Sequence, residues 1–224
     1  MEVRCVSTGR VRSKRAKTGL RRYLPGGWSE ETAPVNVFLV EHPAGGCLFD
    51  AGQSARAASP GYLPRWHPFL RLARFELSPE DEAGTQIDPA SVRWVALSHL
   101  HTDHVGGLDP FRDAEVLVSR AEWTRASGLA GRLRGYLPRH WPAGLEPRLV
   151  DFGGPPVGPF PASHDIAGDG RLLLVPTPGH TPGHMSLLAR NGDGGYLLGG
   201  DLELDEPVAA YCEREGLLYL ETHR

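Results

Sequence analysis

The sequence has little cysteine and no long apolar run, and these two shortages exclude several classes of protein. Its 224 residues include three cysteines at wide spacing without a CxxC pair, so neither a disulfide framework nor a thiolate zinc site is indicated. No apolar stretch approaches the length of a membrane span, and charges occupy the N-terminal positions where a secretory signal would be apolar. We therefore expect a cytoplasmic protein that does not act at a membrane.

A surplus of charge of one sign is also missing. The formal net charge is −3, which gives no general attraction to nucleic acid, and we expect no nucleic-acid partner. The local exception is residues 1–22, which carry eight basic side chains against one acid. We interpret these residues, which begin a basic N-terminal segment over 1–30, as a solvated loop; the alternative is an arm that steers an acidic substrate or contacts a partner subunit. The sequence therefore leaves undecided whether the protein forms a homodimer.

The pattern of short apolar runs indicates one domain over residues 1–224 with a mixed fold. Runs at 34–41 and 46–50 flank a turn and predict a hairpin, and residues 93–98 predict a buried strand. The last third predicts three strands, a helix over 206–215 and a final strand over 217–220. Hairpins and helices within one chain of this length favour an α+β or layered α/β fold.

Several local signals mark the ends of elements. Residues 1–7 alternate weakly between apolar and polar and predict an edge strand. SRAEW at residues 119–123 has the spacing of a capping box, with Ser119 as the N-cap and Glu122 at the third helical position. Asp205 is placed to cap the later helix, and Gly216 is placed to end it.

The strongest functional signal is SHLHTDHVGG at residues 98–107, which follows a predicted strand. Side chains two apart in an extended segment point the same way, so His99 and His101 can hold one ion together. Asp103 and His104 fall where the chain must turn, and the two glycines permit a tight bend. Imidazole suits zinc, iron or nickel, and a carboxylate suits a harder ion or a proton-handling role. The segment therefore predicts a metal site at a strand end.

HLHTDHVGG resembles the signature of the metallo-β-lactamase superfamily, and three further segments agree with it. TPGHTPGH at 177–184 resembles the loop that carries the family's next histidine ligand, and GGD at 199–201 resembles the segment with its metal-bridging aspartate. VFLVEHPAGGCLFDAG at 37–52 resembles the family's first hairpin. The resemblance implies a metallo-β-lactamase-type β-sandwich flanked by helices, with layered αββα architecture.

The same resemblance implies a site for two divalent metal ions, with zinc expected first and iron or manganese as alternatives. Each implied ligand ends an apolar strand, so all of them can gather at one edge of a sandwich. By position, the ligands are His99, His101 and His180 for one metal, Asp103 and His104 for the second, and Asp201 as the bridge between them.

A last ligand and one supporting residue are less clearly marked. The family usually places a final histidine after a late strand, and His223 has this setting, although it follows Asp201 sooner than usual. We predict that His223 completes the second metal site; the alternative is a frayed terminal histidine in a shortened chain with a weakened site. Asp50 ends a strand, and it either orients a metal ligand or has no role in the site.

Other histidines and aromatic residues receive a structural interpretation. The histidines without ligand spacing to a partner are read as structural or solvated: His42, His67, His140, His164 and His184. Four aromatic residues either wall an apolar substrate pocket or pack in the core, and packing is favoured: Trp28, Tyr62, Trp66 and Phe69.

The predicted function is a metal-dependent hydrolase that cleaves a lactone, an ester or a related bond of a small molecule, with Asp103 as the catalytic proton carrier. The hairpin and TPGHTPGHMSL are most similar to acyl-homoserine lactonases and related organophosphate hydrolases, but those lactonases carry a tyrosine where this chain has Leu204. The alternatives are a thioesterase resembling hydroxyacylglutathione hydrolases, a mononuclear-iron oxidoreductase resembling persulfide dioxygenases, and a metal-binding pseudoenzyme.

Overall fold

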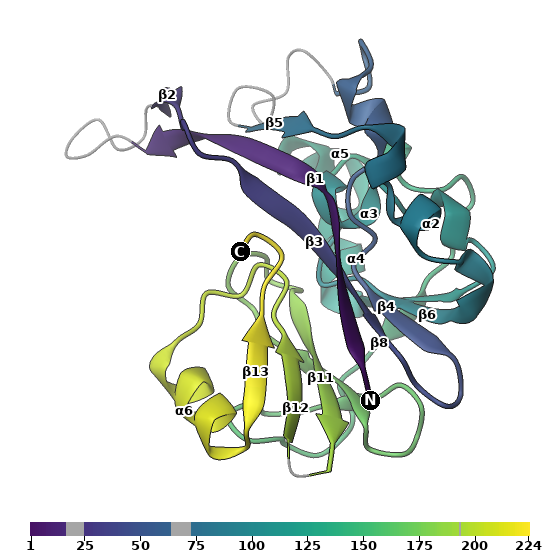
Figure 1. The fold of residues 1–224 in the computed structure, drawn as a ribbon, viewed down its shortest axis with the longest axis vertical. Coiled ribbons are helices and arrows are strands. Elements are labelled where there is room, and N and C mark those ends of the chain that lie inside the picture. Colours follow the sequence, from purple (N-terminus) through teal and green to yellow (C-terminus); the bar gives the residue numbers. More distant parts are fainter. Residues whose placement is uncertain (17–24, 64–72, 193) are drawn as a thin grey trace.

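Two β-sheets pack face to face between outer layers of helix in the computed structural model (Figure 1). The structure describes residues 1–16, 25–63, 73–192 and 194–224. The first sheet has the spatial order β2 (Pro25–Trp28), β1 (Val3–Ala16), β3 (Ala33–Val40), β4 (Gly46–Phe49), β6 (Val92–Ala96), β7 (Glu115–Ser119) and β8 (Arg148–Val150), and β5 (Ala73–Glu76) also pairs with β1. The second sheet has the order β13 (Leu217–Leu220), β12 (Gly194–Leu198), β11 (Met185–Asn191), β10 (Leu172–Pro176) and β9 (His164–Asp165).

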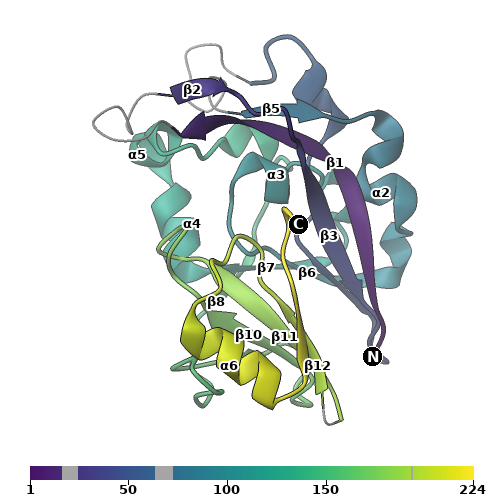
Figure 2. The ribbon, with the colours of Figure 1, turned by 60° about the vertical axis from the view of Figure 1, so that its left-hand side comes forward.

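Helices cover the outer face of each sheet. Figure 2 shows α6 (Glu206–Arg214) against the second sheet, on the side away from the first. The helices that accompany the first sheet are α2 (Ala83–Gln86), α3 (Thr102–Val105), α4 (Arg120–Ala126) and α5 (Gly128–Leu133). Single 3₁₀ turns occupy Ala55–Ala58, Pro79–Asp81, Pro89–Ser91, Asp109–Phe111 and Pro138–His140. None of the helices in the described ranges is both long and apolar enough to cross a lipid bilayer.

Apolar residues fill three layers of core because many strands are buried on both faces. In β3, Phe38 points into the layer between the sheets, while its neighbour Leu39 points toward the helices beyond the first sheet. In β10, Leu174 joins the layer between the sheets, and Leu173 packs beneath α6. These alternating contacts produce the predicted αββα layering, and the expectation of a sandwich flanked by helices is confirmed.

The predicted hairpin and the predicted order of elements in the last third are confirmed. β3 and β4 pair antiparallel, with Phe38 opposite Phe49. Asp205 caps α6 by accepting a hydrogen bond from the Val208 amide, and Gly216 after the helix has a φ of +61°. The last strand, β13, pairs with β12 in parallel.

One expectation about the N-terminal segment is confirmed and another is wrong. Residues 3–7 pair with β3 alone among the described residues, so this stretch is the predicted edge strand, but the strand continues to Ala16, and beyond Ser7 it is also flanked by β5 and β2. The basic segment is therefore largely strand and not a solvated loop, with residues 17–24 outside the described residues. Arg12 pairs with Glu76 of β5 at 3.0 Å, and Arg10 donates to the Thr32 hydroxyl. Cross-strand partners thus accommodate these basic side chains.

Candidate metal centre

The predicted ligands lie at the ends of strands that run in the same direction. β4, β6 and β7 are mutually parallel in the first sheet, and β10, β12 and β13 share one direction in the second. The chain reaches Asp50 after β4, His99 after β6, His180 after β10, Asp201 after β12 and His223 after β13. The topology therefore gathers residues far apart in sequence at one edge of the sandwich.

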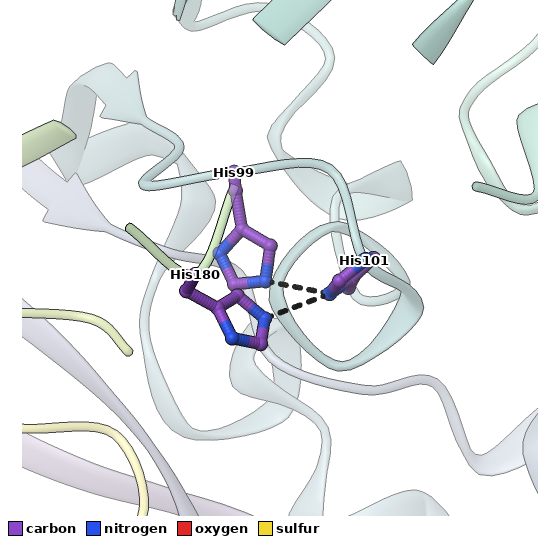
Figure 3. A group of neighbouring side chains, drawn as sticks. All are labelled: His99, His101 and His180. Atoms are coloured by element: carbon purple, nitrogen blue, oxygen red, sulfur yellow. Dashed lines mark hydrogen bonds between the residues drawn. The ribbon is translucent and has the colours of Figure 1, made fainter. Parts of the chain in front are cut away.

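Three imidazoles form the first group of side chains (Figure 3). His101 Nδ1 lies 3.0 Å from His99 Nε2 and 3.1 Å from His180 Nε2. One ring nitrogen carries at most one proton, so His101 Nδ1 cannot donate to both neighbours at once. Three ring nitrogens directed at a common point are instead suited to share one cation.

Burial favours the uncharged form of these rings. It lowers the pKa of His99 well below its usual value, and it lowers the pKa of His101 to about 4 despite the opposing effect of Asp103. Both rings are therefore neutral near neutral pH. Neutral imidazole is the form that binds metal ions, so the group needs no deprotonation before it can hold one.

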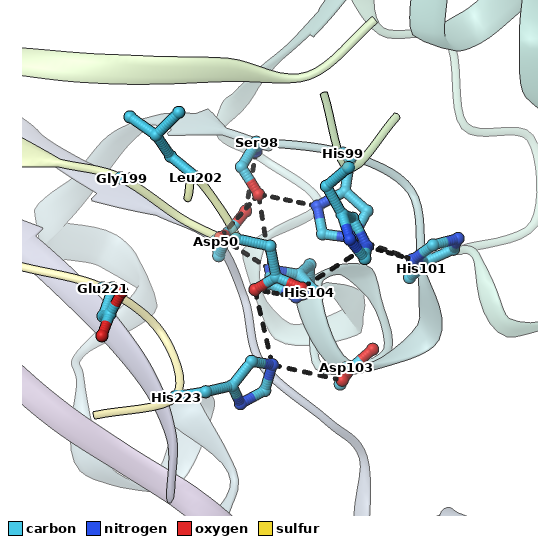
Figure 4. Close-up of polar contacts among 12 residues, drawn as sticks. Asp50, Ser98, His99, His101, Asp103, His104, Gly199, Leu202, Glu221 and His223 are labelled. Atoms are coloured by element: carbon cyan, nitrogen blue, oxygen red, sulfur yellow. Dashed lines mark hydrogen bonds and ion pairs between the residues drawn. The ribbon is translucent and has the colours of Figure 1, made fainter. Parts of the chain in front are cut away.

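A second group contains Asp103, His104 and His223 (Figure 4), and Asp201 lies within 3.5 Å of members of both groups. His223 Nε2 lies 3.7 Å from Asp103 Oδ2 and 3.4 Å from Asp201 Oδ1. The same Asp201 oxygen lies 3.4 Å from His104 Nε2, while its other oxygen lies 3.5 Å from His180 Nε2. Asp201 thus presents one carboxylate oxygen to each group.

Two buried atoms of this arrangement have no hydrogen-bond partner among the described residues. They are His104 Nε2 and Asp201 Oδ1, which face each other. Burial acts to lower the pKa of His104, but the carboxylates of Asp201 and Asp50 outweigh it and raise the pKa well above its usual value. For Asp201, burial acts to raise the pKa, but His104, His223 and His180 lower it overall. The surroundings therefore stabilise positive charge at this point, which fits a bound cation.

Asp50 orients His104 from the side opposite to Asp201. Its Oδ2 lies 2.8 Å from His104 Nδ1, and its Oδ1 accepts a hydrogen bond of 2.7 Å from the Ser98 amide. When the Nδ1–H of His104 donates to Asp50, the Nε2 lone pair faces the site. The expectation that Asp50 contacts and orients a candidate ligand agrees with this geometry.

His223 is held in place by the segment that carries it. The backbone of Thr222 donates to the Gly200 carbonyl and accepts from the Asn36 amide, at 3.1 and 2.9 Å. His223 Nδ1 lies 2.9 Å from the Pro34 carbonyl oxygen, a pure acceptor, so Nδ1 is the donor and Nε2 is free to bind a metal. The alternative of a frayed terminal histidine disagrees with these contacts.

The remaining histidines in the described ranges make structural contacts. His184 is buried beside the first group, where its Nε2 accepts a hydrogen bond from the Asp201 amide. His42 pairs with Asp169 at 2.9 Å. His140 stacks on Tyr62 with ring centroids 3.8 Å apart, and Trp28 lies under the Arg74 guanidinium, so both described members of the aromatic group are in packing contacts. His164 lies in β9, while His67, Trp66 and Phe69 are outside the described residues.

The capping motif explains only part of what Glu122 does. The predicted N-cap is confirmed, because Ser119 accepts a hydrogen bond from the amide of Glu122 at the third helical position. The Glu122 carboxylate, however, bonds to the Leu100 amide and to the Thr181 hydroxyl, each adjacent to a candidate ligand. A capping motif is a local signal, and nothing local distinguishes a carboxylate that returns to its own helix from one that reaches two other loops.

The sequence matches a known family over most of its length. Residues 31–211 match the profile of the metallo-beta-lactamase superfamily. The chain belongs to this superfamily. Among curated proteins it is 33% identical over 186 residues to the N-acyl homoserine lactonase AttM of Azorhizobium caulinodans, a match covering 77% of this chain and 66% of that protein. It is also 33% identical to AttM of Agrobacterium fabrum, over 74% of this chain and 63% of that protein.

This chain therefore spans slightly less than two thirds of the length of each of these two lactonases. A probable metallo-hydrolase of Mycobacterium tuberculosis is 34% identical over 74% of this chain and 56% of its own length.

Solved structures share the fold. An N-acyl homoserine lactone hydrolase with the product N-hexanoyl-L-homoserine at its catalytic metal centre superposes with a TM-score of 0.73 at 21% identity, covering 99% of this chain and 92% of that one. AidC, a dizinc quorum-quenching lactonase, superposes with a TM-score of 0.60 at 15% identity, covering 99% of this chain and 86% of its own. These similarities confirm the metallo-β-lactamase fold.

Proposed function

We propose that the chain is a metal-dependent hydrolase that opens lactones. The observation that carries this proposal is a pair of buried atoms without a hydrogen-bond partner among the described residues, His104 Nε2 and Asp201 Oδ1, at the meeting point of the candidate ligands. Two curated relatives at 33% identity are named as lactonases. Their names support a lactone as the substrate, in preference to the other bonds that hydrolases of this kind cleave.

The residues that would hold two divalent ions follow from the two groups of side chains. His99, His101 and His180 would hold the first ion, Asp103, His104 and His223 the second, and Asp201 would contact both. This set of imidazole nitrogens and carboxylate oxygens suits zinc first and iron or manganese next. When bound, such a pair of ions lowers the pKa of a shared water and polarises a carbonyl oxygen.

Asp103 is the residue that we propose to carry the proton. Its side chain is largely buried, and its Oδ2 faces His223 Nε2 at 3.7 Å. Opening of a lactone expels an alkoxide, which needs a proton as the ring bond breaks. A carboxylate beside the reacting centre can take the proton from the attacking water and deliver it to the departing oxygen.

A cavity of about 570 Å³ next to Asp103 and His223 gives the rest of the substrate a place to bind. This volume lies within the usual range for small-molecule sites. Small side chains such as Ala33 and Ala73 contribute to its lining, which contains no lysine or arginine among the described residues. Within the described part of the chain, Glu31 is the one acid of this lining besides Asp103. An uncharged lactone fits these surroundings better than an anionic glutathione thioester, so we rank the thioesterase second.

The homoserine lactone ring itself is not part of the proposal. At the position where acyl-homoserine lactonases have a tyrosine, Leu204 is 41% exposed and offers no donor to a lactone carbonyl. The proposed substrate class is therefore lactones in general.

A panel of substrates tests this function on the zinc-loaded chain. Simple γ-lactones, acyl-homoserine lactones, a glutathione thioester and a phosphotriester are compared by kcat/KM, with proton release or thiol release as the signal. The proposal predicts the highest kcat/KM on a lactone. A higher value on the thioester would favour the second candidate. Full metal loading without turnover on any substrate would favour a pseudoenzyme, and oxygen uptake by an iron-loaded chain would favour an oxidoreductase.

A further inference from the structure

Glu122 is a fully buried acid outside the two groups of candidate ligands, at 0% exposure in the first turn of α4. Ser119 caps that turn by accepting a hydrogen bond from the Glu122 amide at 3.1 Å. The Glu122 side chain does not complete the reciprocal half of a capping box. It leaves its own helix and contacts two loops that come from different sheets.

Both carboxylate oxygens of Glu122 are engaged by donors next to candidate metal ligands. Oε1 accepts a hydrogen bond of 3.1 Å from the Leu100 amide, which lies between His99 and His101. Oε2 accepts a hydrogen bond of 2.7 Å from the Thr181 hydroxyl, which follows His180. One carboxylate therefore bridges the two chain segments that supply the first group of imidazoles.

Further contacts fix the same region. The Ser119 hydroxyl donates a hydrogen bond of 2.5 Å to the Gly183 carbonyl, so the loop after His180 is also anchored to the start of α4. A Cβ on Gly183 would lie 2.1 Å from the Glu122 amide nitrogen, which shows how closely the loop approaches. Tyr136 packs against His101 with ring centroids 5.3 Å apart, and burial together with the Glu122 carboxylate raises the pKa of Tyr136.

We propose that Glu122 is a positioning residue that holds the His99–His101 segment and the His180 loop at the separation required to bind the first metal. This inference rests on the proposed metal centre. Glu122 acts through hydrogen bonds to Leu100 and Thr181 and does not itself touch the ion. Partners of this kind typically change metal affinity by about 10- to 100-fold.

The chemistry of the two donors explains why a carboxylate is required. Both partners present an N–H or O–H hydrogen, so two acceptor oxygens are needed. Glutamine at this position keeps the shape but offers one acceptor oxygen, and its amide group would face a donor. If its oxygen accepts from the Leu100 amide, its NH2 can only donate to the Thr181 oxygen, so the Thr181 hydroxyl hydrogen loses its acceptor and the charge-assisted bonds to a carboxylate are replaced by weaker neutral ones.

The test is the zinc affinity of Glu122→Gln, measured by competition with a chromogenic chelator and independent of catalysis. Val208→Ala serves as the control for general destabilisation, because Val208 is buried beneath α6 in a different core layer. We expect Glu122→Gln to lose about 10- to 100-fold in affinity for the first zinc equivalent. We expect Val208→Ala to keep wild-type affinity although its melting temperature falls.

A second pair of variants tests the same link from the other side. Thr181→Val keeps the shape and removes the hydroxyl, whereas Thr181→Ser keeps the hydroxyl. We expect a loss of affinity for the valine variant and wild-type affinity for the serine variant. Both substitutions weaken or remove the same hydrogen bond, between Glu122 and Thr181. The double variant Glu122→Gln/Thr181→Val should therefore lose less zinc affinity than the product of the two single losses.

The outcomes separate this inference from the function on which it rests. Zinc binding by Glu122→Gln and Thr181→Val within about twofold of wild type would overturn the role of Glu122 alone and leave the metal centre in place. A wild-type chain that holds no zinc would overturn both. A chain that binds zinc but opens no lactone would overturn the proposed activity while the affinity series still decides the role of Glu122.

Discussion

Asp50 Oδ2 lies 2.8 Å from His104 Nδ1, and Asp50 reaches this position with a φ of +61°. It is the only residue other than glycine with a positive φ among the described residues. This left-handed conformation is disfavoured for most side chains but is tolerated by aspartate and asparagine. Asp50 follows β4 directly, and this backbone conformation directs its buried carboxylate at the candidate ligand His104. The orientation of that ligand therefore depends on the backbone conformation of Asp50.

Replacement of Asp50 separates the effect of its charge from the effect of its backbone. Asparagine tolerates the same φ, so Asp50→Asn should stay folded while it weakens the bond that orients His104. We expect affinity for the second zinc equivalent to fall by about 10- to 100-fold, as measured by chelator competition. Asp50→Ala should in addition lower the melting temperature further than asparagine does. Unchanged zinc affinity in the asparagine variant would show that Asp50 does not orient a ligand.

His223 is the residue on which the second metal depends most clearly. His223→Ala should reduce the zinc content from about two ions per chain to about one, because the second group would lose one of its three members. Metal analysis after dialysis gives the number directly. Arg224→Ala is a matched control, because that side chain is 82% exposed and pairs only with Glu221 among the described residues. Equal metal content in both variants would contradict the assignment.

Asp103 tests the proposed proton transfer. Asp103→Asn should lower kcat for lactone opening by at least about a hundredfold under saturating zinc, with little change in melting temperature. Asp109→Asn provides a control, since Asp109 is a nearby exposed acid that pairs with Arg56 and Arg112. A zinc-saturated asparagine variant at position 103 with a wild-type rate would disprove the catalytic role of Asp103.

The TPGHTPGH loop contains two glycines with different surroundings, which gives an internal comparison. A methyl group on Gly183 would meet the backbone of Glu122 at 2.1 Å, whereas a methyl group on Gly179 would meet nothing within 4 Å. Gly183→Ala should therefore destabilise the fold by about 1–3 kcal/mol or more, measured by chemical denaturation. Gly179→Ala should leave stability nearly unchanged. Similar stabilities would show that the loop does not pack on α4 as described.

The sequence predicted those parts of the site that depend on neighbouring residues. His99 and His101 lie in one short extended segment, so their spacing alone places both rings on one side. The contact between Asp50 and His104 joins residues 54 positions apart, and only the parallel pairing of β4 with β6 brings them together. Sequence reasoning therefore suggested a supporting role for Asp50 but could not name its partner.

In two places the structure extends beyond what the local pattern predicts, and both have the same physical origin. The strand predicted over residues 1–7 extends to Ala16 because β3 and β5 supply hydrogen bonds and partners for a polar stretch without apolar alternation. Glu122 was explained by a local motif, while its carboxylate bonds to loops 22 and 59 positions away. Tertiary partners overrode the local pattern in both cases.

The central claim is that the side chains gathered around Asp201 hold two metal ions. Anomalous diffraction from crystals of the zinc-loaded chain, recorded on both sides of the zinc absorption edge, tests it most directly. The account predicts two zinc peaks within the cluster, one in contact with His99, His101 and His180 and the other with Asp103, His104 and His223, both next to Asp201. Zinc-loaded crystals without an anomalous peak among these side chains would contradict it.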